Sequence, residues 1–132
     1  MSTNFRRQPR VLLADDHTGI LKAVRRTLAA SCDVVGEVRS GDEVVDALHR
    51  HDPEIVVLDL SLPGPNGLDL CPKIKELRPA TKIIVLTALD DVEVQAECIL
   101  RGASAVVLKN LLAVDLPPAI QQAWKGDAAS PA

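Results

Sequence analysis

Five short apolar runs, each followed by a segment with helical periodicity, alternate along this chain of 132 residues. The apolar runs lie at Val11–Ala14, Cys32–Val38, Ile55–Leu58, Lys82–Thr87 and Ala103–Lys109, and the helical segments at 20–28, 41–51, 68–77, 91–101 and 115–126. The third run has no polar residue, which is typical of a strand that is covered on both faces. Alternation of this kind predicts a parallel sheet with helices on both faces and right-handed crossovers. We therefore expect one α/β domain of the doubly wound type.

The composition excludes several classes of function. Aromatic residues make up 2% of the chain, which argues against a stacking platform for bases or a flavin. The net charge of −3 argues against nucleic-acid binding through a basic face. Cys32, Cys71 and Cys98 lack the spacing of a metal site or a disulfide framework, so we interpret them as buried thiols. We find no apolar run of membrane-spanning length and no secretory leader, and expect a cytoplasmic location without membrane contact.

Polar residues of suitable types close four of the expected strands. Asp15 and Asp16 follow the first strand, Asp59 follows the third, and Thr87 and Lys109 close the fourth and fifth. The carboxyl ends of parallel strands lie along one edge of the sheet, so these five side chains can meet in a shallow pocket. A single acid at such a position is more often a helix cap or a loop residue. Five suitable residues along one edge favour a shared site.

The grouping of three carboxylates points to a cation. Carboxylates that lie close together repel one another, and their pKa values rise unless a cation is present. An all-oxygen ligand set with few protein groups suits Mg²⁺. An aspartate beside such an ion can attack phosphorus and form an acyl phosphate, while Lys109 and the Thr87 hydroxyl hold other phosphoryl oxygens. The residue types predict a Mg²⁺-dependent phosphoryl-transfer site.

Four segments resemble the motifs of the bacterial response-regulator receiver family, the phosphoacceptor part of two-component systems. They are LLADDH at Leu12–His17, VVLDLSLPGPNGL at Val56–Leu68, IIVLTA at Ile83–Ala88 and GASAVVLK at Gly102–Lys109. The segments occur in the order and spacing of the family, and the resemblance extends from Arg10 onward. It implies a single flavodoxin-like, or CheY-like, (βα)5 domain whose parallel strands have the order 2-1-3-4-5.

The resemblance also implies roles for the acidic residues. Asp59 matches the aspartate that is phosphorylated. Asp16 matches the acid that ligates Mg²⁺ directly, Asp15 the acid that acts mainly through metal-bound water, and the backbone carbonyl of Ser61 a further ligand. A sensor histidine kinase donates the phosphoryl group in this family. The domain is not a metabolic enzyme, although it catalyses its own phosphorylation and dephosphorylation.

Thr87 and Lys109 match the switch hydroxyl and the phosphate-binding lysine of the family. Three other positions of the chain depart from what is expected of the family or of a regular helix. Val106 occupies the position where the family usually has an aromatic switch residue, three residues before the lysine. We expect signalling to proceed through Thr87 and the loop after it, without an aromatic gate. Asn110 replaces a proline that many members have. Pro72 predicts a late start or a kink in the third helix.

Three further segments resemble NarL/LuxR-type regulators, namely ADDH after the first strand, VVGEVRSGDEVVDAL after the first helix, and the tail AIQQAWKGDAASPA. In those regulators a comparable tail leads to a helix-turn-helix domain, which this chain does not contain, so DNA would be contacted only through that additional domain. Two interpretations stay open: an excised receiver of a transcriptional regulator, which the tail favours, and a natural stand-alone receiver that binds a protein partner. A phosphorylation-dependent homodimer is compatible with either.

We divide the chain into a flexible N-terminal arm at residues 1–9, a receiver domain at 10–126, and a tail at 127–132 that begins a linker or is disordered. Arg6, Arg7 and Arg10 are interpreted as part of a solvated arm. His17 adjoins the acidic pair, and we expect it to start the first helix rather than to accept phosphate.

Three other classes of protein fit the residues less well. A phosphatase of the haloacid dehalogenase type needs a second acid two residues after its nucleophile, where this chain has Ser61. A flavin carrier of the flavodoxin type needs a phosphate-binding loop and aromatic walls, where this chain has Asp15, Asp16 and His17. A nucleotide-binding P-loop needs a G-x-x-x-x-G-K motif, which the sequence lacks.

Overall fold

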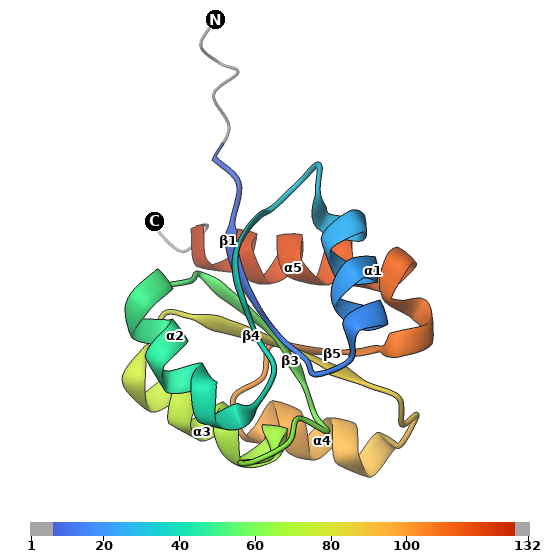
Figure 1. Cartoon of the computed structure of the whole chain (residues 1–132). Helices are drawn as coiled ribbons and strands as arrows, with labels where there is room; N and C mark the ends of the chain where they lie inside the picture. Colours follow the sequence, from blue (N-terminus) through green and yellow to red (C-terminus); the bar gives the residue numbers. More distant parts are fainter. Residues whose placement is uncertain (1–6, 129–132) are drawn as a thin grey trace, which may run out of the picture.

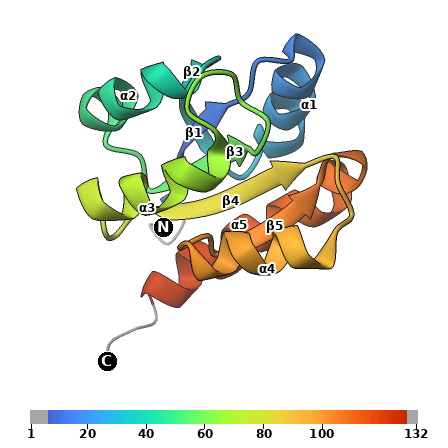
Figure 2. The same cartoon turned by 90° about the horizontal axis from the view of Figure 1, so that it is seen from below.

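The computed structural model describes residues 7–128, and each of the five apolar runs forms a strand in it (Figure 1). The strands are β1 (Arg10–Ala14), β2 (Asp33–Val38), β3 (Ile55–Asp59), β4 (Lys82–Thr87) and β5 (Ala105–Leu108). All neighbouring strands pair in parallel, in the order β2-β1-β3-β4-β5, which can be followed in Figure 2. The predicted fold class and strand order are confirmed.

Within residues 7–128, five α-helices cover the two faces of this sheet. They are α1 (Thr18–Leu28), α2 (Val44–His51), α3 (Gly67–Leu77), α4 (Val92–Leu100) and α5 (Leu112–Ala128), with short 3-10 turns at Gly41–Glu43 and Lys109–Leu111. Helices α1 and α5 lie on one face, and α2, α3 and α4 lie on the other (Figure 1). The arrangement is the one that successive right-handed crossovers produce.

The two-residue period of the strands divides the core between the two faces. Along β1, Val11 and Leu13 pack with the buried side chains of α1 and α5, whereas Leu12 and Ala14 pack with those of α2, α3 and α4. β3 and β4 alternate in the same way, and all of these strand residues are almost fully buried. Because both faces are covered, the strands are continuously apolar rather than alternating in polarity.

Side chains that accept hydrogen bonds define the starts of three helices. The Nδ1 atom of His17 accepts a hydrogen bond from the backbone N–H of Ile20, so His17 caps α1 as predicted. Asn66 caps α3 and Asp91 caps α4, each through a side-chain oxygen that accepts backbone N–H bonds. These caps satisfy donors that have no partner inside the helix.

Three helices begin before the predicted ranges 20–28, 68–77 and 115–126, and α1 does so at Thr18. Helix α3 starts at Gly67, so the late start that Pro72 suggested is wrong. Helix α5 starts at Leu112 rather than near Asp115, directly after the 3-10 turn that follows β5. The buried side chains Leu112, Leu116 and Ile120 are spaced by four residues, and this apolar stripe keeps the first turn helical although two prolines follow it.

The described part of the N-terminal arm is held against the domain. Arg7 forms an ion pair of 2.8 Å with Glu54, and the guanidinium of Arg10 donates hydrogen bonds to the backbone carbonyls of His51 and Asp52. Arg7 and Arg10 therefore contact the domain, although the Arg7 side chain remains 64% exposed to solvent. Residues 1–6 of the arm, and residues 129–132 of the tail, lie outside the described part of the chain.

The burial of the cysteines and the lengths of the helices agree with what the sequence predicts. Cys32, Cys71 and Cys98 are buried and unpaired, as predicted, and burial raises the pKa of Cys71 to about 12. Within residues 7–128, no helix combines the length and the apolar character that a membrane crossing requires.

The exposed Pro72 inside α3 yields a prediction about stability. Proline lacks the N–H that would donate to the carbonyl of Leu68, so we expect Pro72→Ala to raise the free energy of unfolding by about 2 kcal/mol. Urea unfolding at neutral pH measures this change. Glu76→Ala, at an exposed position of the same helix, serves as the control and should change stability by less than about 0.5 kcal/mol. A Pro72→Ala variant no more stable than the native chain would contradict the prediction.

Candidate phosphoryl-transfer site

The register of the strands brings the predicted residues to one edge of the sheet. Ala14 of β1 pairs with Leu58 of β3, so the residues that follow them, Asp15 and Asp59, are neighbours across the two strands. Asp59 in turn pairs with Leu86, the residue before Thr87. Thr87 pairs with Leu108, the residue before Lys109. Four segments that are distant in the sequence therefore end side by side.

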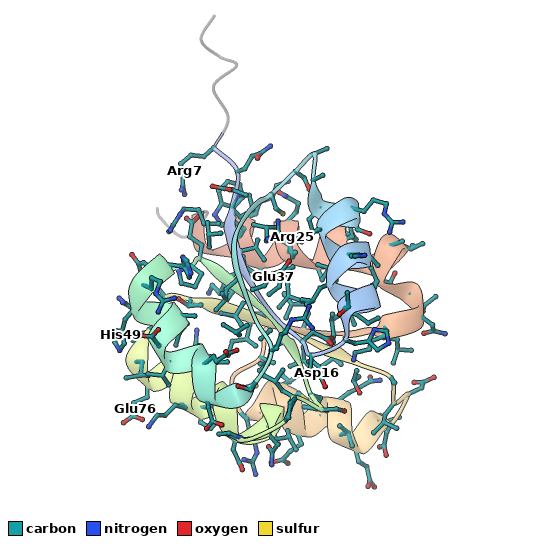
Figure 3. The ribbon with its side chains drawn as sticks, in the orientation of Figure 1. Arg7, Asp16, Arg25, Glu37, His49 and Glu76 are labelled. Atoms are coloured by element: carbon teal, nitrogen blue, oxygen red, sulfur yellow. The ribbon has the colours of Figure 1, made fainter. Side chains whose placement is uncertain are left out.

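Asp15, Asp16 and Asp59 form an acidic cluster at this edge. One carboxylate oxygen from each residue lies within 4.8 Å of the others. Asp15 and Asp59 are buried, with 2% and 1% of their surface exposed, whereas Asp16 is exposed. Figure 3 shows Asp16 beyond the end of β1, at the carboxyl edge of the sheet. The cluster thus combines two enclosed carboxylates with one that solvent can reach.

The ammonium group of Lys109 lies between the two buried carboxylates. Its Nζ atom is 3.1 Å from Oδ1 of Asp59 and 3.3 Å from Oδ2 of Asp15. Burial alone would lower the pKa of Lys109, but its hydrogen bond to Asp59 and the two negative charges outweigh this and raise it. Lys109 is therefore charged at neutral pH and offsets part of the acidic charge.

A single lysine does not satisfy the cluster completely. Oδ1 of Asp15 accepts the backbone N–H of His17 at 2.8 Å, but Oδ2 accepts no well-aligned hydrogen bond although it is buried. Burial raises the pKa of Asp15, and the nearby charge of Asp59 adds to this effect. A buried carboxylate oxygen that has only the Lys109 ammonium beside it, close to two other carboxylates, fits a small hard cation. Asp15, Asp16 and Asp59 could hold such an ion.

Backbone amides fix the remaining predicted residues. The backbone N–H of Ser61 donates to Oδ1 of Asp59 at 3.0 Å, so the loop after β3 curls around the carboxylate. The Thr87 hydroxyl oxygen accepts the backbone N–H of Leu89 at 3.0 Å and keeps its own O–H as a donor. Thr87 is buried, whereas Ser61 and Leu89 are exposed.

Two contributors to this edge were not singled out from the sequence. Arg39 follows β2, and its guanidinium donates to the backbone carbonyl of Asp16 at 3.3 Å and to the Thr18 hydroxyl at 3.2 Å. The sequence feature that could have identified Arg39 is its position directly after a predicted strand, because the other site residues were found at the same kind of position. Gly67 is the second, because a Cβ there would lie 2.8 Å from the Cα of Leu60, next to Asp59.

Val106 lies in the middle of β5, opposite Val85 of β4. Its side chain is half-buried and packs against the core cluster of α2, α3 and α4. It also borders a shallow depression with Val92 and Ile99 of α4. An aliphatic side chain therefore occupies the place where the family usually has an aromatic ring.

Comparisons with known proteins agree with this geometry. The family model described as "Response regulator receiver domain" matches residues 11–121. The nitrate/nitrite response regulator protein NarL of Escherichia coli is 32% identical over 119 residues, which cover 89% of this chain and 55% of that protein. The chain thus spans about half the length of the curated relatives it matches.

Solved structures show the same likeness. The signal receiver domain of the putative response regulator NarL from Mycobacterium tuberculosis superposes with a TM-score of 0.85 at 25% identity, covering 92% of this chain and 99% of that one. The isolated receiver domain of RcsB from Salmonella enterica, in the presence of phosphomimetic BeF3⁻, has a TM-score of 0.84 at 30% identity, covering 91% of each chain.

The position of Lys109 yields a prediction about stability and pH. In Lys109→Met two buried carboxylates lose their counter-charge, so we expect the free energy of unfolding to fall by about 3 kcal/mol at pH 7 without metal. The pKa of Asp15 in the folded state lies above its ordinary value, so the folded state binds a proton at the Asp15 carboxylate more tightly than the unfolded chain does. The loss should therefore shrink as the pH falls from neutral through the raised pKa.

Urea unfolding between pH 7 and pH 4 in the presence of a chelator measures both effects. Lys22→Met, which removes an exposed lysine of α1, is the matched control and should have little effect at any pH. A loss in Lys109→Met that is equally large at every pH would contradict the prediction.

Proposed function

The chain belongs to the response regulator receiver family, with NarL-type and RcsB-type regulators among its relatives, and we propose that Asp59 is its phosphoacceptor. Membership implies a role in two-component signalling. The observation that carries the finer proposal is the position of Lys109, 3.1 Å from Oδ1 of Asp59 and beside the acidic cluster. A cation and three carboxylates in this arrangement suit the transfer of a phosphoryl group to a carboxylate.

The two oxygens of Asp59 differ in their surroundings. Oδ1 accepts the Ser61 N–H at 3.0 Å and lies 3.1 Å from Nζ of Lys109, so both of these groups contact the same oxygen. We assign the attack on phosphorus to Oδ2. The new bond joins this oxygen to phosphorus, the bond between phosphorus and the donor breaks, and the donor atom takes the electron pair. The product is a mixed anhydride of the Asp59 carboxyl group and phosphate.

Each neighbouring residue would then stabilise a different part of the transferred group. The ammonium group of Lys109 can form an ion pair with one phosphoryl oxygen, and the Thr87 hydroxyl can donate a hydrogen bond to another. Mg²⁺ supplies charge neutralisation when bound, and it would be held by Asp15, Asp16, Asp59 and the backbone carbonyl of Ser61. The buried Oδ2 of Asp15, which lies beside Lys109 but accepts no well-aligned hydrogen bond, supports this assignment.

The wider context of the domain is part of the same proposal. We assign the phosphoryl donor to a sensor histidine kinase in the cytoplasm, and the receiver to residues 10–126 between an arm and a tail. Relatives of which this chain spans only about half include the protein named DNA-binding transcriptional activator DevR/DosR of Mycobacterium tuberculosis, 32% identical over 119 residues that make up 55% of that protein. This supports a transcriptional output through a separate DNA-binding domain, with a phosphorylation-dependent homodimer as one form of the switched state.

Phosphorylation of Asp59 can be tested by intact mass. We expect the native chain, incubated with Mg²⁺ and acetyl phosphate, to gain the mass of one phosphate, because the small donor needs no kinase surface. Asp59→Ala should gain none, and a chelator should prevent the gain in the native chain. Asp33→Ala removes an exposed aspartate at the opposite edge of the sheet and should behave as the native chain does. Equal gains in Asp59→Ala and the native chain would overturn the assignment.

The backbone amide of Leu89 can test whether Thr87 and the loop after it respond to phosphorylation although Val106 replaces the aromatic switch residue. A phosphate mimic such as beryllofluoride should draw the Thr87 hydroxyl towards Asp59 and disturb the bond of 3.0 Å from the Leu89 N–H. Amide NMR should therefore show a large shift at Leu89 in the native chain and in Val106→Ala, but not in Thr87→Ala. If the amide chemical shift of Leu89 in the native chain does not change when the mimic binds, Thr87 does not act as the switch residue.

A further inference from the structure

A second pocket lies at the amino edge of the sheet, opposite the acidic cluster. It has a volume of about 480 Å³, which is in the range of small-molecule sites. Its walls come from the starts of β1, β3 and β4, the end of α3 and the last turns of α5. Figure 3 shows the distance between the two edges, with Arg7 at this end and Asp16 at the other. No step of the phosphoryl transfer uses this pocket.

The pocket is basic although the chain is acidic. Its charged lining consists of Arg7, Arg10, Arg78 and Lys82, against Asp52 and Glu54. This leaves an excess of two positive charges, whereas the whole chain carries a net charge of −3. Positive charge concentrated in a concave site attracts anions more strongly than the same charge on a convex surface. The lining therefore matches a doubly charged anion.

Arg78, the residue after α3, has unused donor capacity in this pocket. Its Nη1 atom is 3.4 Å from Oδ1 of Asp52, and its Nη2 atom donates to the Leu48 carbonyl at 3.4 Å, so both contacts are long. The Nε atom is buried and has no hydrogen-bond partner. A guanidinium in which one buried donor lacks a partner gains from an added acceptor oxygen. Oxyanions offer two such oxygens to one edge of the guanidinium.

Trp124 of α5 forms an apolar wall of the same pocket. The indole Nε1 donates to Oε2 of Glu54 at 3.4 Å, and the guanidinium of Arg7 lies 5.3 Å from the ring centroid. Glu54 also accepts the backbone N–H of Arg10 at 3.0 Å, so it ties the indole to the start of β1. Burial would raise the pKa of Glu54, but the hydrogen bond from Arg7 and the bonds from Arg10 and Trp124 lower it, so the carboxylate stays charged. The charged Glu54 therefore links Arg7 and the indole to the start of β1.

We propose that this pocket binds a compact oxyanion with two negative charges, such as a phosphate group. Arg78 provides directed hydrogen bonds, Lys82 and Arg10 contribute charge, and Trp124 forms the apolar side. The phosphate group could belong to free inorganic phosphate or to a phosphate monoester. An aromatic monoester would gain from contact with the indole, which separates the two sources.

Trp124 makes the proposal directly measurable. It is the only tryptophan of the chain, which has no tyrosine, so fluorescence excited at long wavelength reports on this pocket alone. The native chain is titrated without Mg²⁺ with inorganic phosphate, and in parallel with phenyl phosphate, at an ionic strength held constant with NaCl. We expect a saturable change in emission with a millimolar dissociation constant, confirmed by calorimetry. Tighter binding of phenyl phosphate assigns the site to aromatic monoesters, and equal binding assigns it to phosphate itself.

Two variants of Arg78 and one control separate directed binding from general screening. Arg78→Gln should weaken binding about tenfold or more, whereas Arg78→Lys, which keeps the charge but loses the planar fork, should weaken it less. Arg26→Gln removes the same charge from an exposed position of α1 and should leave the affinity unchanged. Urea unfolding checks that each variant is folded.

Three results would overturn the proposal. The first is the absence of both a fluorescence change and a heat signal up to tens of millimolar phosphate. The second is an equal response to NaCl alone. The third is equal weakening in Arg78→Gln and Arg26→Gln. Failure of Asp59 to accept phosphate would leave all of these measurements unaffected, because the two sites lie at opposite edges of the sheet.

Discussion

The attraction between Lys109 and two buried carboxylates is the interaction on which this edge of the structure depends. Asp15 and Asp59 end neighbouring central strands and are almost fully buried, so their charges would repel each other strongly without a cation. Lys109 contacts both, at 3.3 Å and 3.1 Å, and it reaches them because β5 ends one residue earlier. The lysine offsets the charge only in part. The remaining acidity is what makes the edge suitable for a metal ion and a phosphoryl group.

The order of strands and helices was predictable because each element is apolar over a length that only one kind of structure explains. Runs such as Ile55–Leu58 are too short for a helix and too apolar for an exposed strand. Element ends were less predictable, because they depend on contacts between distant segments. Helix α5 starts at Leu112 since that side chain is buried against the core, which local residue preferences do not reveal. Pro72 suggested a late start of α3, but the Asn66 cap and the packing of Gly67 begin the helix there.

The candidate site was predictable in its residue types and not in its contacts. Topology alone places Asp59, Thr87 and Lys109 along one edge, and the structure adds that Lys109 contacts both buried carboxylates. Arg39 was overlooked because β2 is an edge strand whose end carries no acid. The contacts of Glu54 were beyond sequence reasoning for a different reason. Its partners Arg7 and Trp124 are 47 and 70 residues away, and no periodic pattern links them. The contact between the exposed Arg7 side chain and the domain was not predictable for this reason.

Consecutive residues of β5 face opposite layers of the protein. Val106 packs with the cluster of α2, α3 and α4, and Val107 packs with the cluster of α1 and α5. Lys109 follows this strand directly. A displacement of its ammonium group therefore moves the end of β5, which packs against the helices on both faces of the sheet. A well-packed interior transmits such a displacement rather than absorbing it. A displacement of Lys109 at this edge would therefore reach the helices on both faces of the sheet.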